Sequence, residues 1–86
     1  MDYKYKVGQR VLIRPDLKPE KNYYMRSGPE ADIVNNWAIE EMVERAGKVI
    51  QIENIADSQY RAVGWNWTDE MFAGLCDKLF VCKSLL

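Results

Sequence analysis

The sequence predicts a small, mainly β fold with one short helix and one short helical turn. Three observations support this prediction. Short segments alternate apolar and polar residues with a period of two, and turn-forming residues separate these segments. A clear helical period occurs in one segment. The 86-residue length fits one domain, residues 1–86, and its many aromatic side chains suit a small core because each can bury a large area.

The first strand is expected at residues 9–14, where Val11 and Ile13 fall on one face. Gly8, which precedes the strand, suits a turn or a bulge. Pro15 ends the strand, because proline has no backbone N–H to donate to a neighbouring strand. The chain is therefore expected to leave the sheet at this proline.

A long loop is predicted after this strand, from residue 15 to residue 29. The segment contains three prolines, a glycine and several charged residues. Its apolar side chains are Tyr23, Tyr24 and Met25. Two interpretations remain open. These side chains either pack the loop on the core or line a binding groove, since long loops in small domains often carry function.

Residues 37–46 form the predicted helix. Asn36 is expected to cap its start with a side-chain hydrogen bond, and Gly47 is expected to end it in the left-handed conformation. Acidic residues occupy the first turn, where negative charge is favourable. The apolar positions follow the spacing i, i+3, i+4, i+7: Ile39, Met42, Val43 and Ala46.

Two more strands are expected after the helix. Ile50 and Ile52 share one face of the first, and Tyr60 and Ala62 share one face of the second. The segment NIADSQ lies between them and supplies turn residues whose side chains bond nearby backbone groups.

The stretch WNWTDEMF, residues 65–72, is the most unusual part of the chain, and Gly64 marks a turn or kink before it. Trp65 and Trp67 fall on the same side of a strand because side chains alternate. Thr68 is expected to cap a short helical turn that begins with two acidic residues. We interpret the two indoles as a staple that closes a barrel end; an aromatic docking face is the alternative.

The C-terminal residues 76–86 fit either a helix or a last strand that pairs with the first, and we favour the strand. Cys76 and Cys82 are expected to be small, buried or half-buried apolar residues without a redox or metal role. The chain has no histidine, so the commonest metal ligand and general base is absent. No metal and no cofactor is expected.

Charge is distributed unevenly along the sequence. Residues 1–26 carry seven Lys or Arg against three acidic residues, and residues 27–86 carry five against ten. We expect the two signs to mix on the surface, which disfavours general affinity for nucleic acid. The chain lacks an apolar run of membrane-spanning length and an apolar secretion signal, so no membrane association and a cytoplasmic location are predicted.

Three blocks of the sequence resemble small uncharacterised proteins of phages and prophages in Gram-positive bacteria. Two departures are the insert SGPEADIVNN and the short spacing from Tyr60 to Trp65. The matching positions are Val7, Gly8, Val11, Ile13, Arg14, Asp16, Leu17, Met42, Gly47, Lys48, Ile52 and residues 65–72. The resemblance implies an SH3-like small barrel. GQRVLIRPDL and GKVIQI…YR are also faintly similar to Mib/Herc2 domains, which implies a protein-interaction fold.

A protein-interaction module is the leading functional hypothesis, and the resemblance places it in a phage, with a host or phage protein as partner, including a host-defence component. Small barrels bind peptides through aromatic grooves or at free strand edges, so a homodimer is a further option. The residues proposed to contact the partner are Tyr23, Tyr24, Met25, Arg26 and Trp65.

Nucleic-acid binding is the alternative hypothesis, with Tyr23 or Tyr24 stacked on a base. The residues expected to contact phosphates are Arg10, Arg14, Lys18, Lys21 and Arg26. A third option is an acidic mimic of nucleic acid. Its candidate residues are Glu40, Glu41, Glu44, Glu53, Asp69 and Glu70.

Enzymatic activity is the least favoured class. The five glycines are scattered and form no phosphate-binding loop. The acidic pairs Glu40–Glu41 and Asp69–Glu70 are expected to place charge at helix starts, because adjacent helical residues point in different directions.

Overall fold

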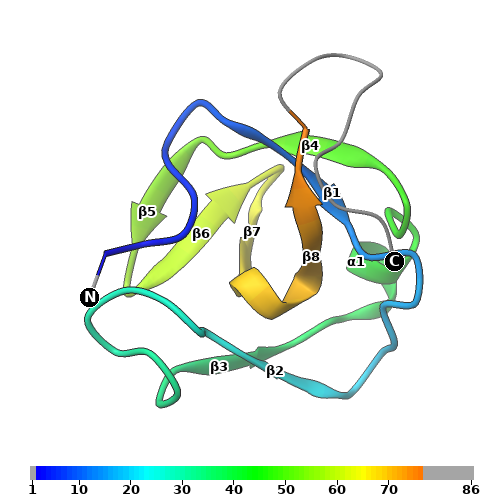
Figure 1. Ribbon diagram of the computed structural model, residues 1–86. Helices are drawn as coiled ribbons and strands as arrows, with labels where there is room; N and C mark the ends of the chain where they lie inside the picture. Colours follow the sequence, from blue (N-terminus) through cyan, green and yellow to red (C-terminus); the bar gives the residue numbers. More distant parts are fainter. Residues whose placement is uncertain (1, 77–86) are drawn as a thin grey trace.

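The computed structural model describes residues 2–76 of the chain. Within this range the fold is mainly β, with eight strands in three small sheets around a shared core (Figure 1). The elements in chain order are β1 Arg10–Ile13, β2 Asn22–Tyr24, β3 Asn35–Trp37, α1 Glu40–Val43, β4 Val49–Gln51, β5 Asn54–Ala56, β6 Gln59–Ala62, β7 Trp65–Trp67, the 3-10 turn η1 Asp69–Met71, and β8 Phe72–Leu75.

The first sheet has the order β4-β1-β8, with both neighbours antiparallel to β1. Val11 and Ile13 point into the core as the alternation predicted. The strand is two residues shorter than the predicted 9–14. Partners of Val11 are Ile50 in β4 and Leu75 in β8. On the side away from β4, the strand that pairs with β1 is thus β8. The sequence predicted that residues 76–86 would form the strand that pairs with β1, and apart from Cys76 these residues lie outside the described range.

The second sheet is the hairpin β2–β3, which crosses the lower part of the view in Figure 1. The sequence predicted one long loop from residue 15 to residue 29, and this prediction is wrong for residues 22–24. Residues 22–24 form a strand because Tyr23 and Met25 alternate toward the core, where both are fully buried. Strand β2 therefore divides the predicted loop into the β1–β2 connection and the first part of the β2–β3 connection.

The helix is much shorter than predicted. It covers Glu40–Val43 instead of residues 37–46, and its N-cap is Ile39, which makes no side-chain capping bond. Asn36, the predicted cap, belongs to β3 instead. Gly47 adopts a positive φ of 78°, as expected for the residue that ends this segment.

The third sheet, β5-β6-β7, is built from two tight hairpins. The two-residue turns are Asp57–Ser58 and Val63–Gly64, and all four residues have positive φ. Such turns match the right-handed twist of antiparallel strands. Only two residues of the NIADSQ segment form the turn, because its first three belong to β5 and its last, Gln59, begins β6.

Aromatic side chains fill the centre of the core. Trp67 is fully buried, and its ring centroid lies 6.0 Å from that of Phe72. Tyr5 and Tyr60 pack edge to face at 5.8 Å, and each also contacts Phe72. Tyr60 comes from the alternating face predicted for β6, so this part of the core follows directly from the sequence pattern.

Cys76 is buried, but it is disulfide-bonded and not a free thiol. The burial predicted for Cys76 is confirmed, whereas its disulfide bond was not predicted; the bonding partner lies outside the described residues. Disulfides are rare in the reducing cytoplasm, so the cysteine count gives no support to a cytoplasmic location. In residues 2–76 no helix is long and apolar enough to cross a membrane.

Candidate functional site

The acidic pair of WNWTDEMF binds the edge of β2 that faces away from β3. Glu70 accepts a hydrogen bond of 2.7 Å from the backbone N–H of Tyr24, and Asp69 accepts one of 2.7 Å from that of Arg26. These two N–H groups point to the same side of the strand because they are two residues apart. The two carboxylates thus take the place of a neighbouring strand. The sequence predicted only that they place negative charge at the start of a helical turn.

The turn that carries these carboxylates is η1, as the sequence predicted, but its cap differs from the prediction. Thr68 occupies the N-cap position without a side-chain capping bond. Its hydroxyl is buried and has no hydrogen-bond partner among residues 2–76. The turn is therefore held by Asp69 and Glu70 and not by a threonine cap.

A buried network extends from Asp69 to the N-terminal segment. Ser27 donates a hydrogen bond of 2.5 Å to Asp69 Oδ2. Its oxygen accepts from the backbone N–H of Lys4 at 2.9 Å and lies 3.2 Å from the hydroxyl of Tyr60. Because the serine proton points to the carboxylate, Tyr60 is the donor in that pair, and its oxygen accepts from the N–H of Tyr5. The network joins three distant parts of the chain.

The tyrosines near this network are poor proton carriers at neutral pH. Burial raises the pKa of Tyr5 to about 12, with further increases from the charge of Asp69 and from Tyr60. Burial also raises the pKa of Tyr60. A general acid or base works best when its pKa lies near the working pH. The network therefore serves to hold the fold together.

The predicted partner-binding residues do not form one surface. Tyr23 and Met25 are core residues, so the first of the two interpretations, packing of the loop on the core, is correct for them. Tyr24 and Arg26 lie together at the surface, with the guanidinium 5.1 Å from the ring centre. Trp65 lies elsewhere, beside α1.

Both indoles of β7 pack inward, in agreement with the predicted staple. Trp67 is fully buried and donates its ring N–H to the carbonyl of Ala62 at 2.9 Å. Trp65 is half-buried against Trp67, with ring centroids 6.4 Å apart in an edge-to-face arrangement. The guanidinium of Arg45 lies 5.3 Å from the Trp65 ring centre and covers its outer side.

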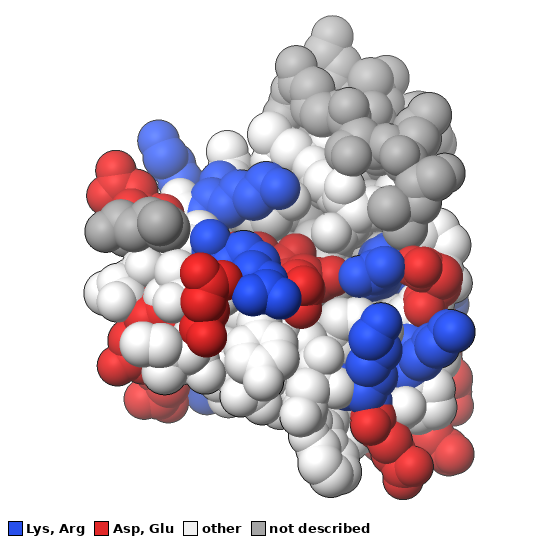
Figure 2. All heavy atoms as spheres, turned by 60° about the horizontal axis from the view of Figure 1, so that its bottom comes forward, with Lys and Arg blue, Asp and Glu red and all other residues white. Residues whose placement is uncertain are grey.

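The basic residues proposed for phosphate contacts are partly neutralised within the chain. Arg14 pairs with Asp16 at 2.7 Å, and Arg26 pairs with Asp32 at 2.8 Å and with Glu70 at 3.0 Å. Figure 2 shows Lys and Arg interspersed with Asp and Glu across this face of the molecule. The mixture of signs agrees with the prediction from the sequence.

The remaining candidates of this set, Arg10, Lys18 and Lys21, are exposed. The ammonium of Lys21 lies 5.3 Å from the ring centre of Tyr23, on the outer side of the core. Arg10 lines a small pocket on β1 with Gly8 and Cys76. These three cations are available to solvent; Arg10 lies in β1, and Lys18 and Lys21 lie in the loop between β1 and β2.

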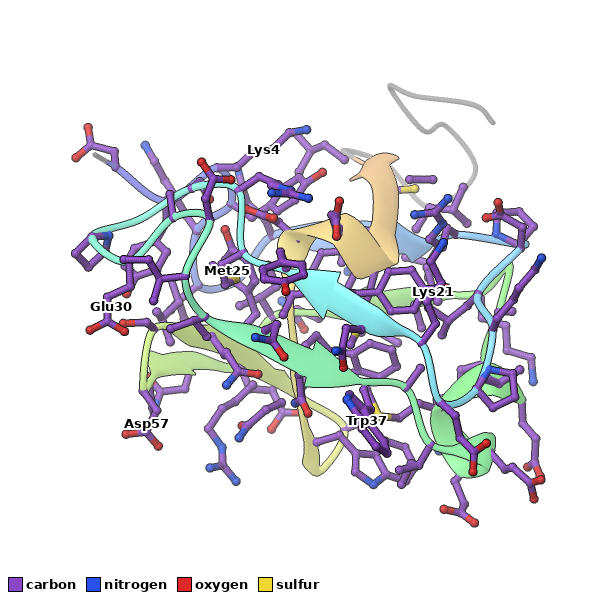
Figure 3. All side chains as sticks on the ribbon, turned by 90° about the horizontal axis from the view of Figure 1, so that it is seen from below. Lys4, Lys21, Met25, Glu30, Trp37 and Asp57 are labelled. Atoms are coloured by element: carbon purple, nitrogen blue, oxygen red, sulfur yellow. The ribbon has the colours of Figure 1, made fainter. Side chains whose placement is uncertain are left out.

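The surface that the sequence analysis missed is centred on Trp37. This side chain is 55% exposed, and Ile39, two residues later, is 42% exposed. Between them Ala38 is fully buried, so the segment alternates as a strand does. This alternation was the available signal, but the helical spacing of later residues obscured it. Figure 3 shows Trp37 at the α1 end of the hairpin, away from the turn that carries Glu30.

The exposed tryptophan lines a pocket of about 300 Å³ that we call the Trp37 pocket. Its floor is fixed from two sides. The backbone N–H of Glu20 donates to the carbonyl of Ala38 at 3.1 Å, which joins the loop after β1 to the segment before α1. Asn36 turns inward and donates to the carbonyl of Asn66 at 3.1 Å, which ties β3 to β7. The lining residues are Pro19, Glu20, Trp37, Ala38, Ile39 and Glu40.

A second pocket of about 270 Å³ contains Trp65 and lies against α1. It is lined by Glu41, Glu44, Arg45 and Lys48 in addition to the indole. The short helix thus contributes Glu40 to one pocket and Glu41 to the other. Helix α1 therefore joins two pockets that each contain a tryptophan.

The two pockets differ in their charge. Four exposed glutamates lie along their rims, and within the described chain none of the four forms an ion pair: Glu20, Glu40, Glu41 and Glu44. The Trp65 pocket includes Arg45 and Lys48, whereas no Lys or Arg lines the Trp37 pocket. The Trp37 pocket is therefore an apolar surface with an acidic rim.

No group of three or more His, Cys, Asp or Glu side chains in residues 2–76 is arranged to hold a metal ion. Comparison of the chain with protein-family models, with curated proteins and with solved structures found no match. The resemblance to phage proteins and to Mib/Herc2 domains thus stays a prediction from sequence blocks.

Proposed function

We propose that this chain is a small non-enzymatic protein-interaction module that binds its partner through the Trp37 pocket. The observation that carries the proposal is the exposure of Trp37 and Ile39 on either side of one pocket. Tryptophan is enriched at the centres of protein interfaces, where its large surface leaves water on binding. An exposed indole beside a second exposed apolar side chain has the character of such a centre.

The fold that we propose for this module is an SH3-like small barrel, as the sequence resemblance implies. Support comes from β1, which pairs with both β4 and β8, and from three small sheets that enclose one core. In the setting that the resemblance suggests, a phage encodes the chain and the partner is a host or phage protein, in the cytoplasm. A host-defence component belongs to this class of partner.

The location of the pocket supports recognition more than catalysis. Its side chains come from the loop after β1 and from the segment between β3 and α1. Both segments are fixed by backbone hydrogen bonds, so the apolar surface is preformed. Its only titratable side chains are two glutamates. Preformed apolar surface lowers the entropic cost of binding a partner.

Nucleic-acid binding is the weaker alternative. Arg14 and Arg26 are paired with carboxylates, which leaves Arg10 in β1 and the two lysines of the β1–β2 loop as the unpaired cations of the proposed set in the part of the chain that the structure describes. Binding to phosphates depends on clustered cations that displace counterions. The exposed tryptophan also lies beside glutamates, which repel phosphate.

A peptide-display selection tests the proposed function. A library of random peptides is selected on the immobilised chain, and the selected peptides are then measured against Trp37→Ala and against Ile33→Ala. Ile33 is the matched control because it is also strongly exposed, at 71%, but lies outside the pocket. We expect binders that lose at least about tenfold in affinity with Trp37→Ala and keep it with Ile33→Ala. Binders that are indifferent to Trp37→Ala would refute the proposal.

A further inference from the structure

We infer that the partner inserts a lysine or arginine side chain into the Trp37 pocket, so that the segment recognised is basic. This inference rests on the proposed function and adds the chemistry of the partner to it. It follows from three features of the pocket: an uncovered indole ring, two carboxylates without cationic partners in the described chain, and the absence of Lys and Arg from its lining.

The indole of Trp37 differs from other surface rings of the chain. Arg45 covers Trp65 at 5.3 Å, and Arg26 covers Tyr24 at 5.1 Å. Within residues 2–76 no Lys or Arg lies over Trp37. A ring face attracts a cation because its π electrons make it negative, and tryptophan gives the strongest attraction. Trp37 is thus an exposed tryptophan ring with no cation over it in the described part of the chain.

The carboxylates of the pocket supply the second half of the interaction. Glu20 and Glu40 both line it, the first from the loop after β1 and the second from the start of α1. The closest basic residue in sequence, Lys21, holds its ammonium over Tyr23 and is directed elsewhere. A cation that enters the pocket therefore meets two carboxylates as well as the indole. A phosphate or an acidic segment would be repelled by the same two groups.

The apolar part of the pocket selects the stem of the side chain. Pro19, Ile39 and the indole of Trp37 offer carbon surface next to the glutamates. Lysine and arginine combine a charged head with an apolar stem of three or four methylene groups, so both parts of the pocket are filled at once. Glu41 of α1 and Glu44, the residue that follows the helix, extend the acidic surface toward further basic residues of the partner segment.

The experiment uses n-butylguanidinium as a minimal arginine side chain and n-butylurea as its neutral isostere. Each is titrated into the full 86-residue chain and followed by ¹H–¹⁵N NMR. We expect n-butylguanidinium to shift the indole N–H of Trp37 and the amides of Ile39 and Glu40, with an affinity at least about threefold above that of n-butylurea. Equal responses to the two probes, or shifts that lie elsewhere, would overturn the inference.

Matched variants assign the effect to the pocket. Glu40→Gln keeps the shape of the side chain and removes one charge, so it should lower the affinity for n-butylguanidinium and leave the affinity for n-butylurea unchanged. Glu30→Gln removes an exposed carboxylate on the distant hairpin turn and should change neither titration. An equal loss of affinity for n-butylguanidinium in both variants would show that net charge alone causes the effect, and this result would overturn the inference. Shifts of Trp37 that depend on protein concentration without any probe would make a second copy the occupant, which also overturns it.

Failure of this inference differs from failure of the proposed function. Selected peptides that depend on Trp37 but contain no excess of Lys or Arg would leave the interaction module intact and exclude a basic partner. Selected peptides that depend on Trp37, and that lose about tenfold in affinity when citrulline replaces arginine, support both.

Discussion

Replacement of Asp69 with alanine removes the acceptor that joins η1, the β2 edge and the N-terminal segment. Asp69 is buried and accepts hydrogen bonds from the N–H of Arg26 at 2.7 Å and from Ser27 at 2.5 Å. In the alanine variant the amide loses its partner, and the serine proton is free to turn toward Tyr60. The strand β2 is then held mainly by its pairing with β3.

The size of the effect follows from these contacts. A hydrogen bond to a charged group contributes about 1.5–3 kcal/mol, and the two bonds are not additive because Asp69 also loses its own cost of burial. We expect a decrease of about 3–5 kcal/mol in the free energy of unfolding. A chain of this length has a total stability of roughly 4–13 kcal/mol, so the variant is left close to unfolding.

Urea unfolding at pH 7, followed by tryptophan fluorescence, measures this decrease. Asp69→Asn keeps an oxygen for the amide and should lose about 1–2 kcal/mol, so it still reports if the alanine variant fails to fold. Asp32→Asn is the control, because Asp32 is an exposed partner of the same arginine, and no measurable change is expected. A loss below about 1 kcal/mol for Asp69→Ala would refute the structural role of the carboxylate.

Three further predictions concern the rings and one glycine. Gly28→Ala should lower the free energy of unfolding, measured by thermal unfolding, by at least about 1–2 kcal/mol. Gly28 has φ of +86°, and an added Cβ would lie 2.5 Å from the ring of Tyr3. An unchanged stability would contradict this packing. The free energy of unfolding should fall as pH rises from 10 to 12, because burial raises the pKa of Tyr5 in the folded chain to about 12 and favours the neutral hydroxyl. Tyr5→Phe should make the free energy of unfolding depend less on pH in this range. An unchanged pH dependence in Tyr5→Phe would argue against this role of Tyr5. The neutral quencher acrylamide should quench Trp37 strongly and Trp67 hardly at all, so Trp37→Phe should remove most of the quenchable emission. Quenching that stays at the wild-type level in Trp37→Phe would contradict the exposure of Trp37.

The sequence predicted those parts of the fold that depend on local alternation. Val11, Ile13 and Tyr60 face the core because strand geometry places every second side chain on the same side. The hairpin β2–β3 escaped prediction because its outer edge is bound by Asp69 and Glu70, more than forty residues away in the chain. No local pattern near residue 22 contains that information.

The candidate site escaped prediction for a related reason. Trp37 and Ile39 stand next to a good helical pattern, and the sequence favoured an extension of the helix back to residue 37. The pairing of Trp37 in β3 with Asn22 in β2 overrides that tendency and turns the indole outward. Tyr23 and Met25, which composition made attractive as contact residues, are instead taken up by the core. Exposure depended on tertiary packing, which composition alone does not specify.

The way in which β2 is closed has a consequence for assembly. An unprotected strand edge is a template on which another chain can add, and proteins must guard such edges. Here two acidic side chains occupy the amide hydrogens that an incoming strand would use, at Tyr24 and Arg26. Loss of both carboxylates would thus do more than loosen the domain. It would convert the hairpin into a site for strand exchange between molecules, and the first sign would be dimers or fibrils in which β2 pairs with a neighbour.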